Sequence, residues 1–175
     1  MLSESLKKCD LEMNPREVEA FLVGCLSAEK PMKFDRAIKE LFLEETKVTV
    51  QFNTPEARVE IEKDVKQLWD DISKSLPKRR KNLLVIDGSN LKDEVIALGR
   101  LGDFFLMGMT LAGTSIDDQD DEAGDLLDEM EDHLLLLDEW VAEGEDRLDQ
   151  DKWIEDGQKY KRELAELWGE LCELL

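Results

Sequence analysis

The apolar run from Leu98 to Gly113 is the feature that most constrains how this chain can fold. A membrane-spanning helix needs about 20 apolar residues, and Arg100 and Asp103 interrupt the run near its start. A charge at the centre of a bilayer costs at least about 2.5 kcal/mol. The uninterrupted part, Phe104 to Gly113, holds only ten residues. The sequence therefore predicts a buried core helix and no membrane insertion.

Small residues give this predicted helix a face that a second backbone can approach. Gly108 and Ala112 are four residues apart and so lie on one helical face. Residues 21–24 and 105–108 also share the pattern Phe-Leu-x-Gly. We expect the two helices that carry this pattern to cross closely at their glycines. Self-association through the same face, giving a homodimer, is the alternative.

Apolar residues recur at helical spacing along most of the chain. Residues 18–26 place them at i, i+3, i+4, i+7 and i+8, after the helix-start signal Asn14-Pro15. Similar spacing returns at 34–42, 61–72, 126–137 and 153–175. Pro77 is expected to end the third of these helices. Because 175 residues is the size of one domain, we predict an all-α single domain over residues 1–175. It should be a bundle of about six helices with little or no sheet and a loose segment at residues 1–13.

Charge is unevenly spread along the sequence. Residues 1–100 carry 18 Lys and Arg against 19 Asp and Glu, whereas residues 101–175 carry 5 against 24. This balance disfavours direct nucleic-acid binding, which requires clustered Lys and Arg, and anionic membrane surfaces. It is compatible with a basic partner, with divalent ions or with solubility alone.

Two further features indicate where the protein works. Its three cysteines form no Cys-x-x-Cys pair and are odd in number, which fits a reducing cytoplasm. The N-terminal residues lack the apolar stretch of a secretory signal.

The basic run Lys-Arg-Arg-Lys at 78–81 could be a nucleic-acid or targeting patch. We interpret it instead as cations at a helix C-terminus, where they suit the dipole, and in a solvated linker.

The acidic segment that follows the apolar run is the candidate binding surface. Its carboxylates are Asp117, Asp118, Asp120, Asp121, Glu122 and Asp125. We expect this surface to bind a basic protein partner in a regulatory role, or to mimic nucleic acid on a partner's phosphate-binding surface.

An EF-hand fits this segment poorly, because Ala123 stands where the loop needs Gly when Asp118 is its first position. A preformed calcium loop is therefore not predicted, whereas weak divalent binding by the carboxylates stays open.

The lone histidine, His133, follows Glu129 by four residues. We interpret it as a solvated or helix-paired residue. No motif implies a cofactor.

A second hypothesis belongs to a different class of protein. Residues 83–90, Leu-Leu-Val-Ile-Asp-Gly-Ser-Asn, resemble the opening strand of PIN/NYN-type ribonucleases. The resemblance implies a metal-dependent nuclease in which Asp87, with the acidic cluster, holds the metal. That fold needs further parallel strands with acidic residues at their ends, and none is found after residue 90. The alternative is a turn in which Asn90 or Asp87 caps the central helix.

Two motifs resemble the YgfB/YecA-like family of uncharacterised bacterial proteins. Residues 17–24 are similar to the family's N-terminal helix, which typically reads Glu-Leu-x-Gly-Phe-Leu, and residues 101–108 to its later Trp-x-x-Gly-Phe-x-x-Gly. This chain departs from the motifs at Ala20, Leu101 and Phe104. The zinc-binding tail of longer members has no counterpart, so its metal is not carried over. The resemblance implies an all-helical fold, a bacterial cytoplasm and no established catalytic residues.

Overall fold

A computed structural model describes residues 2–8, 13–42, 54–86, 90–113, 122–144 and 150–175. Seven helices hold 87% of these residues, and no strand occurs among them. The predicted all-α class is confirmed. The helices are α1 Leu2–Lys8, α2 Pro15–Ser27, α3 Phe34–Leu41, α4 Pro55–Lys81, α5 Leu91–Ala112, α6 Glu122–Glu143 and α7 Gln150–Leu174.

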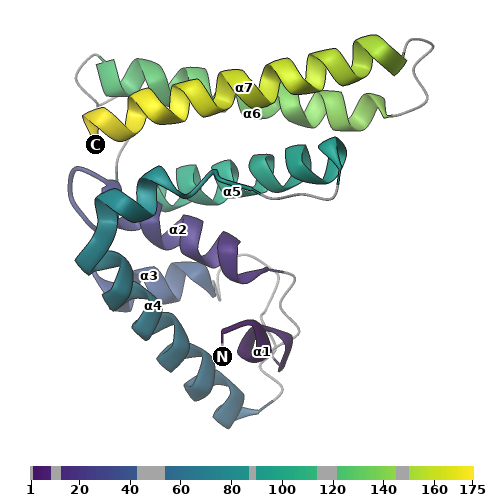
Figure 1. The fold of residues 1–175 in the computed structure, drawn as a ribbon. Helices are drawn as coiled ribbons and strands as arrows, with labels where there is room; N and C mark the ends of the chain where they lie inside the picture. The colour runs from purple at the N-terminus through teal and green to yellow at the C-terminus, as the bar shows by residue number, and fades with distance from the viewer. Residues whose placement is uncertain (1, 9–12, 43–53, 87–89, 114–121, 145–149) are drawn as a thin grey trace.

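The helices are stacked in layers around α2 and α5. Figure 1 shows α6 and α7 as an antiparallel pair lying along α5, with α2 on the other side of α5. α1, α3 and the first part of α4 lie beyond α2, whereas the C-terminal end of α4 reaches α7 (Figure 1). The two central helices are therefore covered from both directions, which explains why α5 is the most apolar helix of the chain.

Local sequence signals set the helix starts. Asn14 caps α2, because its side-chain oxygen accepts hydrogen bonds from the backbone N–H groups of Arg16 and Glu17. The Glu17 carboxylate accepts the Asn14 N–H in return at 2.8 Å, which completes a capping box. Thr54 caps α4 in the simpler one-way manner. The predicted start of α2 is confirmed.

α2 and α5 cross at their glycines. A Cβ placed at Gly24 would lie 2.1 Å from the carbonyl oxygen of Phe105, and one at Gly108 would lie 2.2 Å from that of Phe21. Each glycine therefore faces the phenylalanine of the other helix's Phe-Leu-x-Gly pattern, and the backbones touch. Both phenylalanines are buried. The expected close crossing is confirmed, and the repeated pattern has a reciprocal structural cause.

An ion pair closes one end of this crossing. The Arg100 Nε lies 2.7 Å from the Glu17 Oε1, and the Glu17 side chain is almost fully buried. Glu17 thus serves the capping box of α2 and the contact with α5 at once. On the opposite side of α5, the Phe105 ring meets Trp168 of α7 edge to face, with centroids 4.7 Å apart.

α4 departs from its predicted end. A first helical stretch ends at a kink at Ser75, and a second stretch, which contains Pro77, continues to Lys81. The proline lacks an N–H and so removes one helical hydrogen bond, which agrees with a break just before it, although helical geometry then resumes. The basic run does occupy the last turn of this helix, as expected. Arg80 is the exception to its solvated character, because its side chain is buried.

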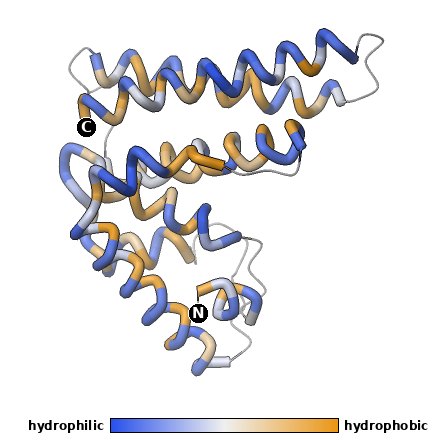
Figure 2. Tube along the Cα trace, in the orientation of Figure 1, coloured by the Kyte–Doolittle hydropathy of each residue, from blue (hydrophilic) through white to orange (hydrophobic). Residues whose placement is uncertain are grey.

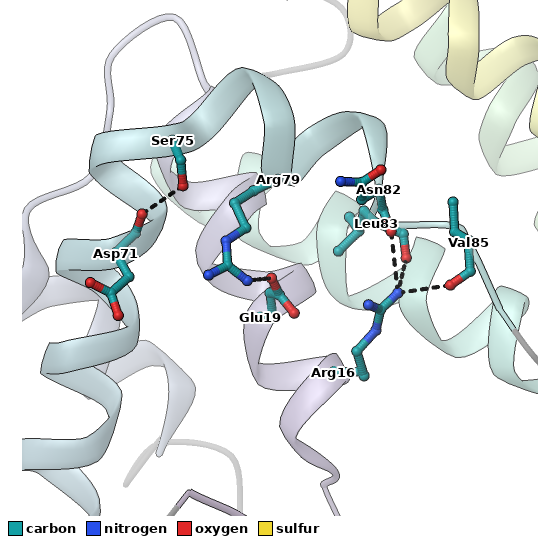
Figure 3. Close-up of polar contacts among 8 residues, drawn as sticks. All are labelled: Arg16, Glu19, Asp71, Ser75, Arg79, Asn82, Leu83 and Val85. Atoms are coloured by element: carbon teal, nitrogen blue, oxygen red, sulfur yellow. Dashed lines mark hydrogen bonds and ion pairs between the residues drawn. The ribbon is translucent and has the colours of Figure 1, made fainter.

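Two arginines fasten the end of α4 to α2 (Figure 3). Arg79 Nη1 lies 2.8 Å from the Glu19 carboxylate. Arg16 Nη2 donates to the carbonyl oxygens of Leu83 and Val85 in the segment that follows α4. The chain between α4 and α5 is thereby held against the start of α2.

The N-terminal segment is more ordered than predicted. The sequence predicts a loose segment at residues 1–13, but residues 2–8 form α1, which packs on α4. Leu6 is buried, and the Ser5 hydroxyl donates to the Asp64 carboxylate at 2.6 Å. The reason is the spacing of Leu2 and Leu6, which places two apolar side chains on one helical face.

α6 and α7 are joined by a pair of tryptophans. The rings of Trp140 and Trp153 stack with centroids 4.1 Å apart, and each indole N–H donates to the other residue's backbone carbonyl. Burial of both rings with both N–H groups satisfied makes this pair the anchor of the α6–α7 hairpin. The helical spacing predicted from the sequence stopped at Leu137 and so missed Trp140.

Among the described helices, α5 has the length and composition that a membrane span requires, and 44% of its most apolar window is buried in the fold. Its contacts with α2, α6 and α7 are those of a core helix.

The α2–α5 crossing gives the first prediction. Gly108→Ala should lower the free energy of unfolding by about 1–3 kcal/mol or more, because the added methyl meets backbone that no rotamer change can move away. The measurement is equilibrium unfolding in urea.

The matched control is Gly169→Ala, at an exposed helical site where a Cβ meets nothing within 4 Å. This variant should gain about 0.5–1 kcal/mol from helix propensity. Equal effects of the two substitutions would contradict the crossing.

Candidate interaction surface

The structure describes part of the predicted acidic surface. Glu122 and Asp125 lie exposed in the first turn of α6. Carboxylates there are stabilised by the positive end of the helix dipole. Asp117, Asp118, Asp120 and Asp121 lie outside the described residues.

The outer face of α6 extends the acidic surface well beyond the predicted residues. α6 carries nine carboxylates and no Lys or Arg, and all nine side chains are exposed. They are Glu122, Asp125, Asp128, Glu129, Glu131, Asp132, Asp138, Glu139 and Glu143. We call them, together with Leu135 and Leu136, the α6 outer face.

Burial on the opposite side of α6 explains why these carboxylates point outward. The buried residues recur every three or four positions and pack on α5 and α7. They are Gly124, Leu127, Met130, Leu134, Leu137 and Trp140. Figure 2 shows hydrophobic and hydrophilic residues alternating along α6, as this amphipathic pattern requires.

Two leucines interrupt the acidic face. Leu135 is 58% exposed and Leu136 37% exposed, with carboxylates on both sides of them along the helix. Apolar side chains among charges do not serve solubility. Successive residues of a helix do not face the same way, so these are two neighbouring exposed leucines, each available to an apolar side chain of a partner.

α7 differs from α6 in its charge. It carries seven carboxylates and four Lys or Arg. One of those cations, Lys161, pairs with Glu94 on α5. The charge asymmetry of the chain is therefore concentrated on α6 within the described C-terminal helices.

His133 contributes to the packing of α6 on α7. Its Nδ1 lies 3.0 Å from the Glu129 carbonyl oxygen, and its Nε2 lies 3.5 Å from the Glu163 carboxylate on α7. The interpretation of His133 as a helix-paired residue is confirmed. In the part of the chain that the structure describes, no group of three or more His, Cys, Asp or Glu side chains could hold a metal ion.

The segment before α5 bears on the nuclease hypothesis. The described residues of the strand-like run, 83–86 and Asn90, form no strand. Asn90 caps α5, since its side-chain oxygen accepts the Asp93 N–H at 2.9 Å. This agrees with the predicted capping turn. Asp87 lies outside the described residues, and those described around it supply no sheet edge for a catalytic metal.

Two carboxylates, Asp103 on α5 and Asp138 on α6, repel each other electrostatically where these helices meet. Burial raises the pKa of Asp103 above its ordinary value, and the negative charge of Asp138 raises this pKa further. Asp138 belongs to the α6 outer face, so a cationic partner that neutralises it would also relieve Asp103.

No protein-family model, curated protein or solved structure matches this chain. Its function is therefore inferred from the geometry and charge of the surface itself.

The Asp103–Asp138 pair gives the second prediction. A carboxyl whose pKa is raised by folding stabilises the protein below its unfolded pKa of about 3.9, and this contribution is lost as the pH rises through the folded pKa. Asp103→Asn should therefore raise the melting temperature at pH 7, with a gain that shrinks as the pH falls toward about 4. Thermal unfolding across this range is the measurement. A gain that is constant with pH would show that ionisation of Asp103 is not its cause.

Proposed function

We propose that this protein is a non-catalytic helical interaction protein whose α6 outer face binds a basic protein partner. One observation carries the proposal: a single helix presents nine exposed carboxylates, no Lys or Arg, and two exposed leucines. The acidic residues from Asp117 to Asp121 precede this helix in sequence and extend the same charge.

The charge of the face supports a fast, steered encounter. A helix of 22 residues extends about 33 Å at 1.5 Å per residue. That length is several times the Debye length of about 8 Å at physiological salt. The carboxylates therefore act as a line of negative charge that attracts a cationic surface and orients it.

The leucines define the chemistry of the partner more closely. Burial of an exposed leucine contributes at most about 1.5–3 kcal/mol, so Leu135 and Leu136 supply affinity that charge alone does not. The complementary partner carries a small apolar patch flanked by Lys or Arg. A basic amphipathic helix laid along α6 meets this description.

Mimicry of nucleic acid is one form of the same function. A partner with a phosphate-binding surface already has the clustered Lys and Arg that α6 requires. Occupying that surface would block nucleic-acid binding, which makes a regulatory role the natural consequence.

We also propose that the protein belongs to the YgfB/YecA-like family and works in the bacterial cytoplasm without a membrane or a cofactor. The family proposal is supported by the location of its two motifs on α2 and α5, the helices that pack against each other. The unpaired state of Cys25 and Cys172 supports a reducing compartment.

The third prediction tests the binding face by affinity capture from the native host at low and high salt. The face variant combines Asp128→Asn, Asp132→Asn and Glu139→Gln. The matched control, Asp35→Asn with Glu56→Gln and Asp71→Asn, removes the same charge from exposed sites on α3 and α4. The parent and the control should retain basic proteins at low salt and release them at high salt. The face variant should retain far less.

Kinetics on the captured partner separate the two contributions. Charge neutralisation on α6 should slow association, whereas Leu135→Ser with Leu136→Ser should speed dissociation. Equal retention by the face variant and the control, with all proteins folded, would rule out the α6 outer face as the binding surface.

A further inference from the structure

A cavity lies where the ends of four helices meet. Its volume is about 630 Å³, within the range of about 300–1,000 Å³ typical of small-molecule sites. It lies beside the C-terminal end of α7, because Leu174 and Leu175 line it. The lining residues used here are Leu26 and Ser27 of α2, Leu76 and Arg80 of α4, Ala123 of α6 and Leu174 of α7.

Two buried polar side chains that line this cavity carry atoms without a hydrogen-bond partner. Arg80 is 7% exposed and Ser27 9% exposed. The Arg80 Nε and Nη1 and the Ser27 Oγ are without partners among the described residues. By contrast, Arg16, Arg79 and Arg100 all reach protein acceptors. A buried guanidinium without an acceptor is costly, so the arrangement calls for a ligand that supplies one.

The backbone at Arg80 is fixed in place. Trp168 on α7 donates its indole N–H to the Arg80 carbonyl oxygen at 3.0 Å. Burial also lowers the pKa of the Arg80 guanidinium below its ordinary value. A well-held, poorly solvated cation is suited to binding an anion, because little reorganisation is needed and water competes weakly.

We propose that this cavity binds a small organic monoanion, with its carboxylate-like group on Arg80 and Ser27 and its apolar body against Leu26, Leu76 and Leu174. A guanidinium matches a carboxylate or a phosphate, and a serine hydroxyl adds one more donor. Ala123 lies in the first turn of α6, where the carboxylates of Glu122 and Asp125 offset the positive end of the helix dipole. Glu29 also lines the cavity and is exposed. Its charge disfavours a dianion, which makes an organic carboxylate a better fit than inorganic phosphate.

The fourth prediction is a titration with hexanoate, followed through the indole N–H signals of the ¹⁵N-labelled protein. Trp168 should shift saturably, because its indole N–H is bonded to the Arg80 carbonyl. Trp140 and Trp153 are bonded to each other and serve as internal controls. Neutral hexanamide and inorganic phosphate, at matched ionic strength, should produce much weaker shifts.

Substitutions locate the site. Arg80→Met keeps an unbranched side chain and should weaken hexanoate binding about tenfold to a hundredfold, the effect of losing hydrogen bonds to a charged group. Ser27→Ala should weaken binding about two- to tenfold. Lys78→Met, the matched control, removes an exposed cation from the same basic run and should leave binding unchanged.

Folding of the Arg80→Met variant is checked separately. Its melting temperature without ligand should equal or exceed that of the parent, because unpaired buried donors have been removed. Should that variant fail to fold, Ser27→Ala and the hexanoate–hexanamide comparison still decide. Absence of a saturable Trp168 shift, or an equal response to hexanamide, would overturn the proposal, as would equal hexanoate affinity in a folded Arg80→Met variant.

Discussion

The backbone contact between α2 and α5 is the interaction on which the other packing depends. At Gly24 and at Gly108 a backbone carbonyl of the opposing helix approaches so closely that any side chain would collide with it. This approach brings Phe21 and Phe105 fully into the core and positions Glu17 to meet Arg100. With α2 on one side, α5 offers its other faces to α6 and α7. The acidic helix is thus held by its apolar side and can leave its charged side in solvent.

This arrangement keeps the apolar core that stabilises the fold apart from the carboxylates of α6. The core is built from residues that alternate at helical spacing with carboxylates, so the negative charge of α6 stays outside the packed interior. Asp103 is the place where the two meet, since its carboxyl is partly desolvated beside Asp138. Arg80 shows the opposite case, a cation drawn into the interior without an acceptor. Arg80 departs from the usual rule that buried charges are paired, whereas Asp103 stays exposed and is only partly desolvated. Both lie near surfaces for which we propose ligands.

The sequence predicted the fold through features that are local. Helical spacing and the Asn14 cap each act within a few residues and are present in the structure. The repeated Phe-Leu-x-Gly pattern is the exception, because it marks a contact between two helices distant in sequence. Three features depend on tertiary contacts and could not be predicted in this way. α4 resumes beyond the kink at Ser75 that precedes Pro77, residues 2–8 pack on an apolar surface of α4, and Arg80 is enclosed by helix ends that are distant in sequence. The sequence predicted carboxylates at the start of α6, of which Glu122 and Asp125 are described and exposed, whereas the exposed leucines of α6 follow from packing on α5 and α7.

Native-state hydrogen exchange tests the central role of the α2–α5 crossing most directly. Backbone amides around Phe21 and Phe105, on the two crossing helices, should exchange only through global unfolding, with protection equal to the free energy measured in urea. Amides of α6 and α7 should exchange through a smaller opening that leaves the crossing intact. Protection that is greatest in α6 and α7, with early exchange around the two phenylalanines, would contradict the account.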